Sequence, residues 1–376
     1  MSFPSILKYP LQGLLLCLLS NCNAFAQGNR PPEWLNKMVK VSSETHDNAG
    51  TLCMVDFPNK NQWIAVAGYA NKAQNVPAIA NYSFEIGSMT KMFIATAILQ
   101  LHEQGLLDIN KPISKYIDEP WVKNLNRFNK KDWSDSISIR SVMNHTAGIY
   151  DYLDDGSDEA TIEKYGYQGR LKISPREIIR TSNTRGSYGP PNKKWRYSNT
   201  GYQALGILIE KVSGQNYQQY IRTHILQPAN LTQTYFGTNM TEQQAKTKMQ
   251  GYFNGQKIQM SFYLAGAAGE IVSTMPDMVK FIRAWWQGDF FSKAETTQLL
   301  RNSSFVGTGS IGQYGLANMH LFNIYGHSGQ TFGFNAFAGI IPEKNIVVIW
   351  VSNDSQASAY SPVINIADKL DPQDKH

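Results

Sequence analysis

Apolar and polar residues change their spacing along this chain: strand-like segments lie near both ends, and helical patterns fill the middle. The strand-like segments, rich in apolar, β-branched and aromatic residues, are 62–69, 82–86, 317–325, 332–341 and 345–352. Helices are expected at 88–104, 139–145, 200–212, 216–226 and 362–370, with further helices that begin at 174 and 276. Residues 28–48 are interpreted as a loop or a short helix.

This order of elements predicts one sheet built from both ends of the chain, with the helical segment inserted between them. We expect the fold class α/β plus all-α. An antiparallel β-sheet flanked by helices is expected from residues 27–100 and 275–376, and a helical domain from residues 101–274. A fold of this kind leaves a cleft between its two parts, where binding and catalytic sites commonly lie.

The composition is that of an ordinary folded protein. The 376 residues are enough for one large domain or two closely packed ones, and 42% of them are apolar. The net charge of +6 is scattered, which favours a solvated surface and gives no sign of nucleic-acid recognition. The histidines show no paired metal-ligand spacing. We therefore expect no metal and no cofactor, and we expect a monomer.

The N-terminal segment is typical of an export signal. Lys8 supplies positive charge, Leu11 to Leu19 is a short apolar stretch, and Ala24-Phe25-Ala26 matches a small-x-small cleavage site. Residues 1–26 are therefore predicted to be a signal peptide, and the mature protein to be exported, periplasmic or secreted. Two alternatives stay open: a lipoprotein signal that anchors the protein through Cys22, and a buried first helix.

Ser88 and Lys91 stand at the start of the helix expected at 88–104, three residues apart and on one face. A helix N-terminus and apolar neighbours both disfavour a nearby cation, so the lysine can be neutral near pH 7. It could then accept the hydroxyl proton of the serine, which activates a nucleophile without a histidine base. Ser5 and Lys8 show the same spacing, but only Ser88 begins a helix, after a Gly87 that permits a tight turn. The alternative is a capping serine beside a surface lysine.

A second candidate element is Tyr197-Ser198-Asn199. A buried tyrosine next to a lysine can lose or relay a proton, and an amide such as Asn199 can hold a substrate carbonyl. Tyr-x-Asn also occurs at Tyr69 and Tyr252, so the pattern alone does not establish a site. An ordinary packed tyrosine at a helix start is the alternative.

A third candidate element is His327-Ser328-Gly329, between strand-like stretches. Gly329 allows the edge of a strand to approach a ligand closely. The backbone N–H groups of Ser88 and Gln330 could then form an oxyanion hole. A strand-edge histidine with a purely structural hydrogen bond is the alternative.

The three motifs in this order resemble the penicillin-recognising serine hydrolases, most closely the group of class C β-lactamases, serine D-alanyl-D-alanine carboxypeptidases and related esterases. Further similar stretches lie at 143–149, 201–206 and 268–277, and the similarity covers about residues 35 to 370. The resemblance implies a β-lactamase/transpeptidase-like fold. It also implies a small peptide, β-lactam or ester substrate, with peptidoglycan as a possible partner.

The resemblance also implies a role for each motif residue. Ser88 would be the acylated nucleophile, and Lys91 would accept or relay its proton. Tyr197 would be the general base in acylation and would activate water in deacylation. Asn199 would orient the substrate amide. In the third motif His327 would assist proton transfer and add positive charge for a substrate carboxylate, Ser328 would bond that carboxylate, and Gln330 would contribute its backbone N–H.

One position departs from the pattern of the family. Class C β-lactamases usually carry lysine where this chain has His327, and similarity with histidine there favours D,D-peptidases and esterases. Because histidine titrates near neutrality, we expect activity to depend on pH between about 5 and 8. The predicted function is a D-alanyl-D-alanine carboxypeptidase-like peptidase. The alternatives are a β-lactamase, a small-ester esterase and a non-catalytic penicillin- or peptidoglycan-binding protein.

Overall fold

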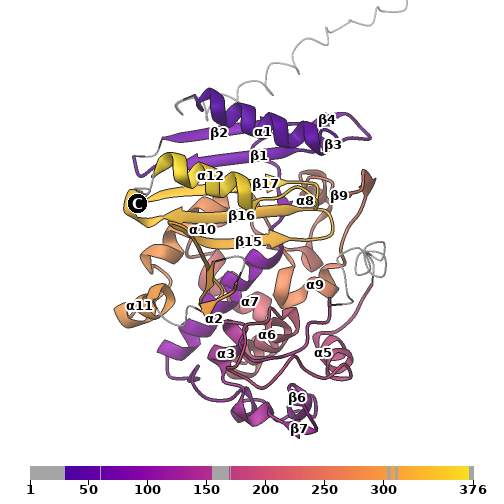
Figure 1. Cartoon of the computed structure of the whole chain (residues 1–376), viewed down its shortest axis with the longest axis vertical. Helices are drawn as coiled ribbons and strands as arrows, with labels where there is room; N and C mark the ends of the chain where they lie inside the picture. The colour runs from indigo at the N-terminus through magenta and orange to yellow at the C-terminus, as the bar shows by residue number, and fades with distance from the viewer. Residues whose placement is uncertain are drawn as a thin grey trace, which may run out of the picture.

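The computed structural model describes residues 30–59, 61–154, 169, 171–302, 306–309 and 312–371 (Figure 1). The predicted signal peptide, including Lys8 and Cys22, lies outside these residues. No helix within the described ranges is long and apolar enough to cross a membrane.

An eight-stranded antiparallel sheet forms the upper half of the molecule in Figure 1, in the order β12-β13-β14-β15-β16-β17-β1-β2. Its strands are β1 (Thr51–Asp56), β2 (Gln62–Ala67), β12 (Val306–Gly307), β13 (Gln313–Tyr314), β14 (Met319–Leu321), β15 (Ile324–Gln330), β16 (Asn335–Ile341) and β17 (Ile346–Ser352). Strand β1 pairs with β17 along its whole length. The prediction of an antiparallel sheet built from both chain ends is therefore confirmed.

Both faces of this sheet are covered. Helices α1 (Glu33–Thr45) and α12 (Tyr360–Leu370) lie over one face, and α10 (Met275–Gln287) packs against the other (Figure 1). On β17, Val348 and Trp350 join the cluster of α1 and α12, whereas Val347 and Ile349 join the main core on the α10 side. Strands covered on both sides read as continuous apolar runs. Helix α1 lies within the segment 28–48, so of the loop and the short helix expected there, the helix is observed.

Helices make up most of the lower half of Figure 1. Between β1 and β12 the described residues form, besides α10, the α-helices α2 (Thr90–Glu103), α3 (Ile139–Met143), α5 (Pro175–Asn183), α6 (Asn199–Ser213), α7 (Tyr217–Ile221), α8 (Glu242–Lys246), α9 (Phe262–Gly269) and α11 (Ala294–Asn302). A three-stranded sheet in the order β5-β11-β8 consists of Phe84–Glu85, Ile271–Ser273 and Tyr235–Phe236. Three hairpins pair β3 (Tyr69–Asn71) with β4 (Val76–Pro77), β6 (Arg127–Phe128) with β7 (Lys131–Asp132), and β9 (Tyr252–Phe253) with β10 (Gln256–Lys257).

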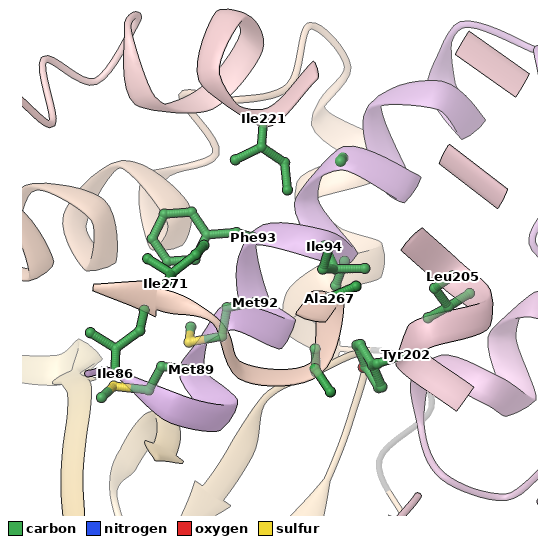
Figure 2. Packing of buried hydrophobic residues seen from close by; sticks show 14 of the residues in the cluster. Ile86, Met89, Met92, Phe93, Ile94, Tyr202, Leu205, Ile221, Ala267 and Ile271 are labelled. Atoms are coloured by element: carbon green, nitrogen blue, oxygen red, sulfur yellow. The ribbon is translucent and has the colours of Figure 1, made fainter. Parts of the chain in front are cut away.

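Helix α2 is the central element of the fold. Every residue from Thr90 to Leu101 is buried, and α2 contacts α6, α9 and α7. Figure 2 shows apolar side chains of α2, α6 and α9 meeting in one cluster. The Phe93 ring stacks on Phe281 of α10 with centroids 3.7 Å apart, which joins α2 to the sheet side of the core. Because α2 is packed all round, the residues at its start are held rigidly.

Local signals in the sequence correspond to the observed helix ends. Ser174 and Glu177 form the predicted capping box at the start of α5. Helix α6 ends at Gly214, which has a φ of 71°. The helix predicted from Ser88 begins instead as the 3₁₀ turn η2 (Gly87–Met89) and continues as α2. The domain boundaries predicted at 100/101 and 274/275 stay predictions.

Candidate active site

Ser88 and Lys91 lie together at the junction of η2 and α2. The Nζ atom of Lys91 is 3.0 Å from Ser88 Oγ, 2.8 Å from Asn199 Oδ1 and 2.7 Å from the carbonyl oxygen of Ala268. Asn199 is the first residue of α6, and Ala268 lies near the end of α9. Three helices thus meet at one fully buried amine.

These contacts determine how an uncharged Lys91 must be oriented. The oxygens of Asn199 and Ala268 can only accept hydrogen bonds, so they take the two protons of a neutral amine. The lone pair of Nζ then faces Ser88, whose hydroxyl can donate to it. In the ammonium form all three contacts are donated by Lys91 instead. The geometry therefore suits both the proton acceptor and its protonated product.

Burial lowers the pKa of Lys91 to about 7, although the charge of Asp151 acts in the opposite direction. Asp151 Oδ2 accepts a hydrogen bond from Asn199 Nδ2 at 2.9 Å, which turns Asn199 Oδ1 towards the lysine. Burial also raises the pKa of Asp151 to about 6, against the effect of hydrogen bonds from Leu153 and Asn199. With a pKa of about 7, a large fraction of Lys91 is uncharged at neutral pH and can accept a proton.

Tyr197 lies beside the same pair. Its hydroxyl is hydrogen-bonded to Ser88, and its ring centroid is 5.0 Å from Lys91 Nζ. Burial raises the pKa of this phenol well above its ordinary value. Tyr197 is therefore protonated at neutral pH, which suits a proton donor or relay better than the general base expected from the sequence.

A cleft of about 1090 Å³ opens above these groups. Ser88, Tyr197 and Asn199 line it, and Ser328 and Gln330 of β15 line it from the sheet side. The sequence-predicted serine, tyrosine, asparagine and strand residues are thus brought to one place, although together they span more than 200 positions of the chain.

Strand β15 approaches the serine turn very closely. A Cβ atom on Gly329 would clash with the carbonyl oxygen of Ile86, and a Cβ atom on Gly87 would lie 2.9 Å from the backbone nitrogen of Gln330. Gly87 also has a φ of 52°, a conformation that favours glycine. The two glycines bring the Gln330 backbone beside Ser88, as an oxyanion hole made by these two residues requires.

His327 differs from the sequence-based expectation. Its imidazole is fully buried, with Nε2 2.8 Å from the Tyr314 hydroxyl and Nδ1 2.5 Å from the carbonyl oxygen of Ser328. Burial lowers the pKa of His327 to about 3, so the ring is uncharged at neutral pH. It cannot supply the positive charge expected for a substrate carboxylate, and it does not titrate between pH 5 and 8.

The comparisons with known proteins agree with this geometry. The sequence profile of the β-lactamase family matches residues 36–370. The chain belongs to the β-lactamase family. The family is one of serine hydrolases, and the fold class expected from the motifs is confirmed.

Two curated relatives of this β-lactamase-family chain come from Bacillus subtilis. A putative penicillin-binding protein PbpX is 29% identical over 279 residues, covering 70% of this chain and 64% of the relative. Penicillin-binding protein 4* is 26% identical over 322 residues, covering 79% of this chain and 66% of the relative. The chain thus spans less than two thirds of the length of either relative. Among solved structures, a D-stereospecific amidohydrolase from Streptomyces sp. superposes with a TM-score of 0.75 at 23% identity, covering 90% of this chain and 98% of the other.

Sequence reasoning missed several residues of the site. Asp151 follows an ordinary loop pattern, and only its contact with Asn199 reveals it. Tyr360, at the start of α12, places its hydroxyl 2.6 Å from Ser328 Oγ in the cleft. Lys193, Lys194 and Arg196 also line the cleft, on the loop that leads into Tyr197. Within the described ranges, no group of three or more His, Cys, Asp or Glu side chains could hold a metal ion.

Proposed function

We propose that this serine hydrolase is a D-alanyl-D-alanine carboxypeptidase-like peptidase that works through an acyl-enzyme on Ser88. The observation that carries the proposal is the environment of Lys91 Nζ. Lys91 Nζ donates hydrogen bonds to two carbonyl oxygens, those of the Asn199 side chain and the Ala268 backbone, and Ser88 Oγ lies 3.0 Å from it. A partly exposed serine with a buried neutral base behind it is the arrangement that nucleophilic catalysis needs.

Acylation begins when the Ser88 hydroxyl gives its proton to Lys91 Nζ and its oxygen forms a bond to the substrate carbonyl carbon. The backbone N–H groups of Ser88 and Gln330 stabilise the oxyanion of the tetrahedral intermediate. When the C–N bond breaks, the protonated Tyr197 hydroxyl donates to the leaving amine and takes a proton back from Lys91. In deacylation, water gives a proton to the same pair while its oxygen forms a bond to the ester carbon. The bond between that carbon and Ser88 Oγ then breaks, and the pair returns the proton to Ser88 Oγ.

The charge of the cleft supports a substrate that ends in a carboxylate. With His327 uncharged, the cations that face the cleft are Lys193, Lys194 and Arg196, on the loop that leads into Tyr197. Ser328 offers a hydroxyl on the opposite wall. A peptide with a free C-terminal carboxylate would meet both, with its last amide bond above Ser88.

A second candidate is the hydrolysis of D-amino acid amides. The D-stereospecific amidohydrolase with the same fold favours it. Asp154, an exposed acid that lines the cleft, could bind the ammonium group of such a substrate. β-Lactamase, esterase and non-catalytic binding roles remain outcomes of the test below.

We also propose export with loss of residues 1–26, or lipid attachment at Cys22. The N-terminal mass of the protein purified from its native envelope distinguishes the two.

The test is a time course with a fluorescent penicillin, read by intact-protein mass and by release of D-alanine from a diacyl-Lys-D-Ala-D-Ala peptide. A long-lived adduct with D-alanine release is expected. Ser88→Ala should abolish both, whereas Ser136→Ala, at an exposed serine of another segment, should change neither. Rapid loss of the adduct with penicillin turnover would indicate a β-lactamase. Turnover restricted to D-amino acid amides would indicate an amidase, and turnover restricted to nitrophenyl esters would indicate an esterase. The absence of any reaction would indicate a binding protein.

A further inference from the structure

We propose that His145 and Tyr314 are positioning residues for Tyr197. Together with His327 they form a hydrogen-bonded bridge behind the cleft. The groups at its two ends permit only one arrangement of the protons within it, which we call the proton order. The inference rests on the proposed acyl transfer for its catalytic meaning. The bridge itself is a property of the structure.

The bridge joins the helical part of the molecule to the sheet. His145 follows α3, Tyr314 lies on β13, and His327 lies on β15. The Tyr314 hydroxyl is 3.2 Å from His145 Nε2 and 2.8 Å from His327 Nε2. All three side chains are buried, so water does not compete for these bonds.

The two ends of the bridge determine its proton order. The backbone N–H of Ser198 donates to His145 Nδ1 at 3.1 Å, so a neutral His145 carries its proton on Nε2 and donates it to Tyr314. At the other end, His327 Nδ1 faces the carbonyl oxygen of Ser328 at 2.5 Å and must carry a proton. Neutral His327 then has a bare Nε2, which accepts the proton of Tyr314. In this arrangement each of the four hydrogen bonds, from the Ser198 amide to the Ser328 carbonyl, has one donor and one acceptor.

Tyr202 does not change this order, although its hydroxyl also interacts with Tyr314. The Tyr202 proton is donated to the carbonyl oxygen of Met143 at 2.7 Å. If Tyr314 donated to Tyr202 instead, His327 would need protons on both nitrogens. Burial opposes that cation by lowering the pKa of His327, and Lys91 opposes it further whenever the amine is protonated.

His145 acts on Tyr197 from both sides. Its backbone carbonyl accepts the N–H of Arg196 at 2.9 Å, and its imidazole accepts the N–H of Ser198. Tyr197 is the residue between these two amides, and its ring lies over the imidazole with centroids 4.1 Å apart. Ser198 is also the N-cap of α6, the helix that begins with Asn199. The imidazole, oriented by Tyr314, therefore sets the position of the whole Tyr-x-Asn segment.

The proton order can be measured in the unmodified protein. Nitrogen-15 NMR of labelled histidine at neutral pH should show His145 protonated on Nε2 and His327 protonated on Nδ1. Single-histidine variants assign the two signals. If both rings carry the proton on the same nitrogen type, or if either ring is a cation, the bridge does not exist as proposed.

The positioning role is tested with Tyr314→Phe, which keeps the ring and removes the two bridging bonds. Acylation of Ser88 by penicillin should slow by roughly 10-fold to 100-fold through the maximal rate rather than through the substrate dissociation constant. Tyr235→Phe is the matched control, because it removes a buried tyrosine hydroxyl bonded to Ser83 away from the cleft. That variant should acylate at the wild-type rate.

His145→Asn and His145→Ala form a second pair. Asparagine places an acceptor where Nδ1 was and suits the positive φ of 61° at this position, so it should restore part of the rate lost in His145→Ala. Wild-type acylation rates in a folded Tyr314→Phe protein, or no difference between the asparagine and alanine variants, would overturn the positioning role. If the wild type forms no acyl-enzyme, the proposed function fails. The bridge is then judged on the tautomers and on hydrogen exchange of the Ser198 amide in His145→Ala.

Discussion

The carboxylate of Asp151 accepts a hydrogen bond from the side-chain amide of Asn199 at 2.9 Å. This bond determines which end of the amide faces Lys91, because the nitrogen is held by the acid and the oxygen points to the amine. The acid therefore acts on the nucleophile through two intermediates, without touching it.

Replacing Asp151 with alanine should loosen this arrangement. Asn199 could then rotate and present its NH₂ group to Lys91, which would misalign the lone pair that accepts the serine proton. We expect acylation of Ser88 to slow by roughly 10-fold to 100-fold. Stopped-flow acylation with a fluorescent penicillin measures this rate. An Asp135→Ala variant, which removes an exposed acid outside the cleft, should leave the rate within about twofold.

The pH dependence of acylation should follow Lys91 and not His327. The lysine must be neutral to accept a proton, so the rate should rise with pH through the pKa of about 7. Asp151 raises that pKa, so Asp151→Asn should move the midpoint to lower pH while keeping an acceptor for Asn199. A pH–rate profile of both proteins tests the shift. A midpoint that moved upward, or did not move, would contradict the assignment.

The cations of the loop before Tyr197 should recognise the substrate carboxylate. Arg196→Ala should raise KM for a peptide with a free C-terminal carboxylate and leave KM for its methyl ester nearly unchanged. Added salt should reduce the difference, since Arg196 is exposed. Lys130→Ala, at an exposed lysine on the segment between β6 and β7, is the control. An equal change in KM for the peptide acid and for its methyl ester would show that Arg196 does not recognise the substrate carboxylate.

Gly329→Ala should separate β15 from the serine turn. The added methyl group would clash with the Ile86 carbonyl oxygen, which no rotamer can relieve, so the strand must shift and carry the Gln330 N–H away from Ser88. Loss of one oxyanion donor typically costs about 100-fold to 1,000-fold in rate. Gly189→Ala, where a Cβ atom would meet nothing within 4 Å, controls for the substitution itself. Acylation and deacylation rates of both variants provide the comparison.

The three motifs were predictable from sequence because each is local. Ser88 and Lys91 are held by one helical turn, and the Tyr197-Ser198-Asn199 segment starts one helix. Their common location could be inferred only through the resemblance to a family. Strand β1 was not predicted, because its apolar run from Leu52 to Val55 is short and is flanked by the polar residues Thr51 and Asp56.

The environment of each residue was the part that sequence could not supply. His327 was expected to titrate near neutrality, and its burial beside Tyr314 decides otherwise. Asp151 and Tyr314 act through contacts with residues 48 and 13 positions away or more, and nothing in their local sequence marks them. Desolvation and long-range hydrogen bonds are properties of the packed fold.

The uncharged state of Lys91 is the claim on which the rest depends. A nitrogen-15 NMR titration of the lysine side chains, with Lys91 assigned by a Lys91→Arg variant, measures it directly. The account predicts that the Lys91 amine loses its proton at about pH 7. An amine that stays protonated up to its ordinary pKa of about 10.4 would contradict it, because Ser88 would then have no base beside it.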